Sequence, residues 1–70
     1  MAIEKVTLPV ARKIANLTQK QLALVVGVSE STVINWEKGR SEPTVSQAKT
    51  IGEVTGIPYD SIIFLTQNTV

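Results

Sequence analysis

Residues 18–40 constrain the fold most, because they predict two short helices joined by a tight turn. Thr18 and Gln21 have the spacing of a capping box, in which each side chain bonds the other residue's backbone N–H at the start of a helix. Gly27 can adopt the left-handed conformation that ends a helix. Ser29 is a favourable N-cap for the helix that follows. We therefore expect helices over residues 19–26 and 30–38.

A helix is also expected before this segment. Leu8, Ala11 and Ile14 follow helical spacing, and Pro9 suits a first helical turn, so the predicted helix covers residues 8–15. Residues 1–7 alternate between apolar and polar types, which fits either a short strand or a frayed terminus.

A second capping box opens the fourth predicted helix. Thr44 and Gln47 have the same spacing as the first pair, and Gly56 is expected to end this helix. Its inner face should carry Val45, Ala48 and Ile51. Pro58 begins a last short helix through residues 59–64. The prediction is an all-α, five-helix fold in a single domain over residues 1–70, with a core of about residues 8–65 and loose or extended termini.

Composition excludes several classes of function. The 70 residues suit one small domain and include neither cysteine nor histidine. Disulfides and thiolate metal sites are therefore excluded, and the usual general base and zinc ligand are missing. Without paired carboxylates in a cleft or a phosphate loop, we expect no enzyme, no metal and no cofactor. No apolar run approaches the roughly 20 residues that span a bilayer, so a cytoplasmic protein without a membrane partner is expected.

The net charge of +1 gives little information about partners. DNA-binding domains usually have a clearer basic excess. The distribution is more informative, because Lys20, Lys38 and Arg40 lie in or beside the predicted helix pair, while Glu53 and Asp60 lie outside it. Ordinary surface charge explains the same pattern.

Small and apolar residues fix how the two helices of the pair cross. Helices joined so tightly meet at a steep angle, and their residues near the crossing must be small. Ala23 meets that requirement, while Val28, Val33 and Trp36 supply apolar contacts. We expect all four in the core, and their joint spacing predicts a helix-turn-helix.

The residues left outside this core are those suited to bind DNA. On the second helix of the pair they are Glu30, Ser31, Ile34, Asn35 and Lys38. A helix in the major groove reads bases with such side chains: Asn pairs with adenine, Glu accepts from cytosine, and an apolar side chain can touch a thymine methyl group. A solvated polar face is the simpler alternative.

Phosphate contacts are expected at two further places. Lys38 and Arg40 lie beyond the second helix, within reach of a DNA backbone. The start of the first helix offers free N–H groups and the positive end of the helix dipole at Thr18, Gln19 and Lys20.

The chain resembles the Cro/repressor-type, or Xre-like, helix-turn-helix DNA-binding family over about residues 8–64. The matching phrases are Leu17-Thr18-Gln19, Leu22-Ala23, Gly27-Val28-Ser29, Thr32-Val33 and Trp36-Glu37-Lys38-Gly39, followed by Pro43 and Gly56-Ile57. The resemblance implies a lambda-repressor-like fold, with predicted helices 2 and 3 as the helix-turn-helix, and a prokaryotic or phage origin.

The resemblance also implies roles for single residues. Gln19 would contact phosphate and support the recognition helix, and Lys38, Gly39 and Arg40 would contact the DNA backbone. The residues facing base edges would be Ser29, Glu30, Ser31, Ile34 and Asn35. Arg12 and Glu37 occupy positions that often form a structural ion pair in this family; two unrelated surface charges are the alternative.

The expected function is a sequence-specific regulator of transcription, a repressor, bound to double-stranded DNA. The chain looks like a small stand-alone phage-type regulator. A homodimer is expected through Ile57, Tyr59, Ile62, Ile63, Phe64 and Leu65, unless these residues simply close the core. Glu30 repels phosphate and should sharpen base selection rather than strengthen binding. The low net charge and Glu30 keep a second function open, an antirepressor-like module that binds another regulator.

Overall fold

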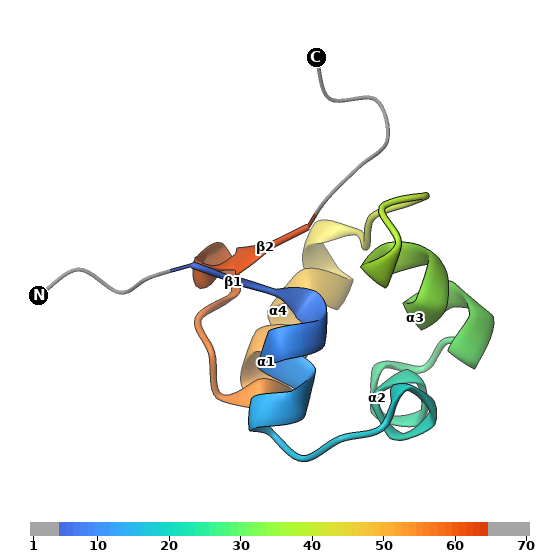
Figure 1. Cartoon of the computed structure of the whole chain (residues 1–70), viewed down its shortest axis with the longest axis horizontal. Helices are drawn as coiled ribbons and strands as arrows, with labels where there is room; N and C mark the ends of the chain where they lie inside the picture. The colour runs from blue at the N-terminus through green and yellow to red at the C-terminus, as the bar shows by residue number, and fades with distance from the viewer. Residues whose placement is uncertain (1–4, 65–70) are drawn as a thin grey trace, which may run out of the picture.

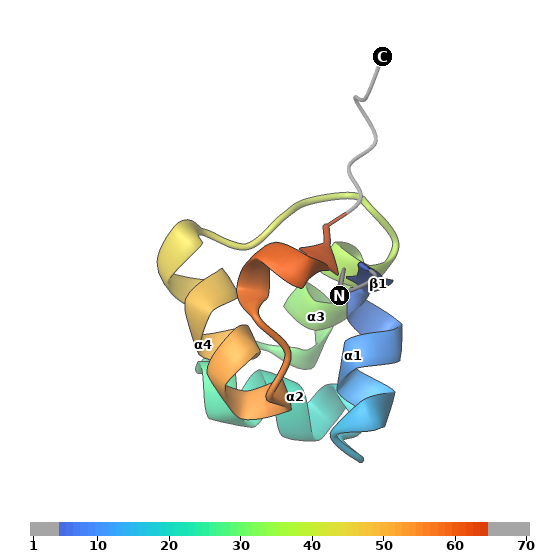
Figure 2. The same ribbon diagram turned by 90° about the vertical axis from the view of Figure 1, so that its left-hand side faces the viewer.

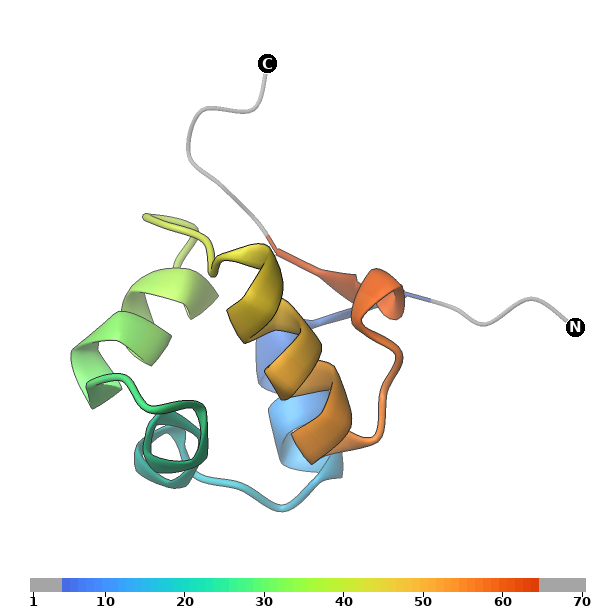
Figure 3. The same cartoon turned by 180° about the vertical axis from the view of Figure 1, so that it is seen from behind.

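A computed structural model describes residues 5–64 of the chain. The elements in order are β1 (Val6–Thr7), α1 (Leu8–Ile14), α2 (Gln19–Val26), α3 (Glu30–Glu37), α4 (Val45–Thr55), the 3-10 turn η1 (Tyr59–Ser61) and β2 (Ile62–Ile63). Helices α2 and α3 form one side of the molecule, and α1, α4 and the two strands form the other (Figure 1). Seen from behind, α4 lies across α1 (Figure 3). No helix within residues 5–64 is long and apolar enough to cross a membrane.

Both predicted capping boxes are present. The Thr18 hydroxyl accepts from the Gln21 N–H at 3.0 Å, and the Gln21 side chain accepts from the Thr18 N–H at 2.9 Å. Thr44 and Gln47 make the equivalent bonds at 3.1 and 2.9 Å at the start of α4. The prediction of helix 2 is therefore confirmed at both ends, since α2 also stops before a left-handed Gly27.

Two helices end one residue earlier than predicted. Helix α1 stops at Ile14 because the chain turns through Asn16, whose φ is 60°, and the Leu17 N–H then donates to the Arg12 carbonyl at 3.1 Å. Helix α3 stops at Glu37, and Lys38 is its C-cap before the left-handed Gly39.

One large apolar side chain from each helix forms the centre of the core. These are Leu8, Leu22, Val33 and Ile51, all fully buried. Ala11, Ala23, Trp36 and Ile62 complete the same cluster. Burying one such large side chain contributes about 1.5–3 kcal/mol, so the four together hold the helices against one another.

The predicted fifth helix is wrong. After Pro58 the chain makes only the 3-10 turn η1 and then enters β2, which pairs in parallel with β1, Val6 opposite Ile62. Figure 2 shows this segment, orange to red, returning from the end of α4 to β1. The β-branched Ile62 and Ile63 favour an extended backbone, and β1 offers unpaired N–H and C=O groups to bond. Residues 1–7 were expected to form either a short strand or a frayed terminus. The strand is correct at Val6–Thr7, and residues 1–4 lie outside the described part.

The predicted inner face of α4 is wrong at one position. Val45 is 67% exposed, whereas Ala48 and Ile51 are buried as expected. Val45 is the first residue of the helix, directly after the N-cap Thr44, and the segment before it has no regular structure. Extending the helical spacing to the first residue of α4 therefore predicted a packing partner for Val45 that the fold does not contain.

Candidate nucleic-acid interface

The turn between α2 and α3 is built from local hydrogen bonds. The N–H groups of Gly27 and Val28 both donate to the Ala23 carbonyl, at 2.8 and 3.0 Å. Gly27 has a φ of 88°, and a side chain there would meet no atom within 4 Å, so its backbone conformation alone calls for glycine. Ser29 then caps α3 by accepting from the Thr32 N–H at 3.2 Å. These bonds fix the direction of α3 relative to α2.

Helix α3 has two distinct faces. Val33 and Trp36 are buried in the core. The opposite face carries the predicted base-reading residues: Glu30 and Ser31 are exposed, and Ile34 and Asn35 are half-buried. A short polar surface with one aliphatic side chain is therefore presented on a helix whose other face is anchored.

Ile34 and Ser29, two predicted base-reading residues, differ from expectation. Ile34 is half-buried rather than exposed, so it offers less apolar surface to a thymine methyl group. The Ser29 hydroxyl is already engaged, because it caps α3 and also hydrogen-bonds the Thr32 hydroxyl at 2.9 Å. The role of Thr32 was missed by sequence reasoning, although its position three residues after an N-cap serine is a recognisable signal.

A hydrogen-bonded group joins α1, α2 and α3. Arg12 donates from Nε to one Glu37 oxygen at 2.7 Å and from its second terminal nitrogen to the other at 3.3 Å. Its remaining nitrogen donates to the Leu17 carbonyl at 2.9 Å. The Arg12 and Glu37 side chains are only 12% and 7% exposed, so water screens this pair little.

Gln19 belongs to the same group. Its side-chain Nε2 donates to Glu37 Oε1 at 2.9 Å, linking the first residue of α2 to the last residue of α3. The family resemblance implied that Gln19 supports the recognition helix, but residue spacing could not predict its bond to Glu37, since the two residues lie in different helices. It places two predicted phosphate-binding sets next to each other, the start of α2 and the end of α3.

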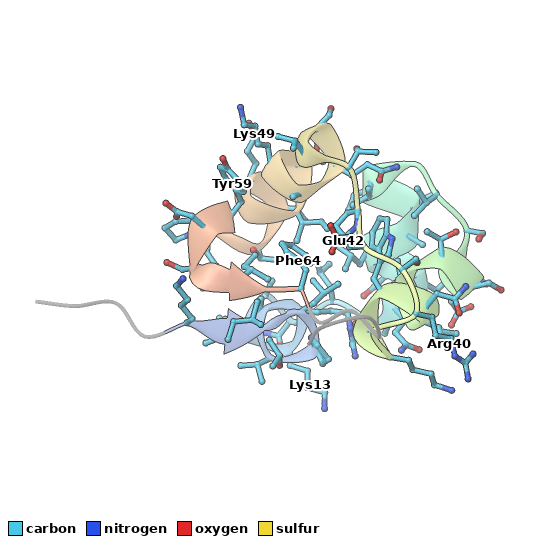
Figure 4. All side chains as sticks on the ribbon, turned by 90° about the horizontal axis from the view of Figure 1, so that it is seen from above. Lys13, Arg40, Glu42, Lys49, Tyr59 and Phe64 are labelled. Atoms are coloured by element: carbon cyan, nitrogen blue, oxygen red, sulfur yellow. The ribbon has the colours of Figure 1, made fainter. Side chains whose placement is uncertain are left out.

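The predicted cations lie around these helix ends. Lys20, Lys38 and Arg40 are exposed. The Arg40 backbone N–H donates to the Asn35 carbonyl at 2.9 Å, which holds the following loop against α3. Figure 4 shows Arg40 at the α3 side of the molecule and Lys49 on the opposite side, near Tyr59. The Lys49 ammonium is 5.9 Å from the centre of the Tyr59 ring.

Residues 5–64 hold no group of three or more acidic, histidine or cysteine side chains that could bind a metal. A shallow hollow of about 240 Å³ lies between α2 and the start of α3, lined by Lys20, Ala23, Leu24, Val28 and Glu30. Leu24 is 80% exposed beside it, an apolar surface that the sequence reasoning did not single out.

A family model described as helix-turn-helix matches residues 10–62 of the chain. The chain belongs to this helix-turn-helix family. The match runs from the third residue of α1 to the first residue of β2 and includes both helices of the motif, so the Xre-like resemblance seen in the sequence is confirmed.

Two archaeal relatives support the same assignment. An uncharacterised HTH-type transcriptional regulator of Methanocaldococcus jannaschii is 39% identical over 51 residues, covering 73% of this chain and 77% of the relative. Another uncharacterised HTH-type transcriptional regulator, from Methanothermobacter thermautotrophicus, is 41% identical over 54 residues, covering 77% and 78%. No solved structure matches the chain significantly.

Proposed function

We propose that this helix-turn-helix protein is a sequence-specific DNA-binding regulator of transcription, acting as a repressor, that inserts α3 into the major groove. The observation that carries the proposal is the two-faced α3, fixed by the Gly27 turn and the Arg12–Glu37 pair while its polar face stays accessible. Membership of the family and the names of its two archaeal relatives support the regulatory role.

In this proposal base reading falls to the N-terminal part of α3. Glu30 accepts from a cytosine amino group, and Ser31 bonds a neighbouring base edge. Asn35 bonds adenine twice, accepting through its side-chain amide oxygen and donating through its side-chain NH2 group. Ile34 makes a limited contact with a thymine methyl group because it is half-buried. The Ser29 hydroxyl serves chiefly as the cap of α3, since its hydrogen bonds are already made within the chain.

Phosphates are held at the adjoining ends of α2 and α3. Gln19 and Lys20 supply backbone N–H groups and a cation at the start of α2, whereas the Thr18 N–H is already bonded to the Gln21 side chain. Lys38 and Arg40 supply cations after α3. Glu37, between them, is paired with Arg12, so its negative charge is largely neutralised before a phosphate approaches.

We further propose that two copies bind adjacent half-sites about 34–36 Å apart, because one such domain reads few base pairs. The structure narrows the predicted dimer surface. Ile62 is buried in the core, and Ile57 and Phe64 pack against it. Tyr59 and Ile63 keep 42% and 37% exposure and remain as contacts, while Leu65 lies outside the described residues.

The test is selection of bound duplexes from a random pool, followed by fluorescence anisotropy over a range of salt concentrations. A DNA regulator selects one motif, and its affinity falls steeply with salt, by about 0.9 log units per log unit of salt for each phosphate neutralised. Sedimentation with duplexes of varied half-site spacing tests the dimer. If the fluorescence anisotropy shows no binding to any duplex at low salt, the proposal is refuted.

A protein-interaction module is the second candidate, and exposed apolar residues on α2 favour it. Leu24 and Val25 are neighbours on α2 and are 80% and 50% exposed, and adjoining exposed apolar residues can form a protein-binding surface. Such a module would bind another regulator through α2 and leave DNA untouched. Replacing Leu24 with Ser should abolish that binding, whereas a DNA regulator should retain its affinity for the selected duplex.

A further inference from the structure

We infer that Glu37 is a positioning residue for DNA binding, which acts by orienting the side-chain amide of Gln19 toward a phosphate. The inference rests on the proposed function. It assigns to Glu37 a role besides its ion pair with Arg12, and it predicts an effect on affinity that is the same for every DNA sequence.

The hydrogen-bond chemistry of the three side chains carries the argument. An ionised carboxylate only accepts hydrogen bonds, whereas a glutamine amide has one accepting and one donating end. Glu37 Oε1 therefore faces the NH2 group of Gln19, 2.9 Å away, and excludes the flipped amide. Arg12 bonds both oxygens of the same carboxylate and holds it still.

The fixed amide has one further N–H to give. The two N–H bonds of a planar NH2 group diverge, so the second points away from the carboxylate. Within residues 5–64, the Gln19 side chain hydrogen-bonds only Glu37. Gln19 is also the first residue of α2, where the backbone N–H groups lack partners within the helix. An anion arriving there meets a preoriented donor beside them.

Orientation matters because a flipped amide would present its oxygen to the phosphate. Two acceptors repel, and a free amide loses rotational freedom when it is ordered on binding. Glu37 removes both penalties before DNA arrives. Glutamine at position 37 would keep the shape of the side chain but bond either end of the Gln19 amide, so the orientation would be lost.

A double-mutant cycle on the full chain tests this role. Glu37→Gln should weaken binding to the selected duplex about fivefold in the parent chain and less than about twofold in a Gln19→Ala background. If Glu37→Gln acted only through net charge or folding, it would change the affinity by the same factor in both backgrounds, and the coupling between positions 19 and 37 would be zero. Glu53→Gln, on the exposed face of α4, makes the same charge change and should leave the coupling absent. An equal loss in both backgrounds overturns the inference but leaves the proposed function standing.

Two further measurements separate positioning from a merely structural role. The salt slope should not become shallower in Glu37→Gln, because the weakened contact joins a phosphate to the neutral Gln19 amide, which displaces no counterion. A shallower slope contradicts the inference. If Glu37→Gln fails to fold, the parent chain still gives an answer by nuclear magnetic resonance. Adding duplex should shift one Gln19 side-chain proton and leave its partner, bonded to Glu37, nearly unmoved. Two unmoved protons overturn the inference, and a parent chain that binds no duplex overturns both proposals.

Discussion

Helices α2 and α4 have matching ends but make different contacts. Each begins with a threonine–glutamine capping box and ends at a left-handed glycine, Gly27 or Gly56. Their first residues differ in surroundings: Gln19 bonds Glu37 of α3, whereas Val45 of α4 is largely exposed. The comparison teaches that capping chemistry sets where both helices begin and end, whereas only the start of α2, where we propose that phosphate binds, is hydrogen-bonded to α3.

The largest expected effect comes from removing the tie between α2 and α3. Glu37→Ala leaves Arg12 with an unpaired charge that is mostly buried, so the free energy of unfolding should fall by about 3–5 kcal/mol. The matched change on α4, Glu53→Ala, removes an exposed carboxylate and should stay within about 0.5 kcal/mol. Thermal and urea unfolding measure both. Equal losses would show that the ends of α2 and α4 do not differ in this way.

The next largest effect is expected on base preference, which we assign to α3, the helix that follows α2. Asn35→Ala should cost about 1–3 kcal/mol at one base pair of the selected site and relax the preference there. Ser46→Ala, an exposed polar truncation on α4, should leave the preference unchanged. Binding to a set of single-base variants measures this. If both affinity and preference survive in Asn35→Ala, this residue reads no base.

The two capping boxes offer a symmetric test. Thr18→Ala and Thr44→Ala each lose one side-chain acceptor, so each should lower the free energy of unfolding by about 1 kcal/mol. Only Thr18→Ala should also weaken DNA binding, because only α2 begins beside α3. Unfolding curves and anisotropy on the same samples separate the two effects. A binding loss in Thr44→Ala would move the proposed interface toward α4.

The smallest expected effect is on DNA affinity, from replacing one surface lysine. Lys38→Ala should weaken binding uniformly across sequences and make the log–log salt slope shallower by about 1. Lys49→Ala, on the opposite side near Tyr59, should change neither quantity. Salt titrations of both variants decide the matter. A loss confined to particular sequences in Lys38→Ala would instead place that lysine on a base.

Much of the helical framework was predictable because its determinants are local. The bonds of Thr18 with Gln21, and of Thr44 with Gln47, join residues three apart, so the spacing of residue types was enough to find them. Gly27 follows the same logic, since its backbone conformation depends on its missing side chain. The inward position of Val33 and Trp36 was predictable for a related reason, because helical periodicity puts both on one face.

The C-terminal segment shows where local reasoning failed. Proline at position 58 followed by apolar residues fits a helix start, yet Ile62 lies in a strand opposite Val6 at the other end of the chain. Only the packed arrangement of α1 and α4 brings these two segments together. The prediction for Val45 failed in the same way, because periodicity gives the direction of a side chain but not whether another element is there to cover it.

The sequence by itself determined both ends of α2 and α4, the turn between α2 and α3 and the family, because each depends on interactions within a few residues or on their fixed spacing. The tertiary structure alone decided the pairing of β1 with β2 and the bond between Gln19 and Glu37, because these groups are distant along the chain. The candidate site depends on both. Its side chains follow from the face that Val33 and Trp36 leave outside, while the orientation of Gln19 follows from a carboxylate on another helix.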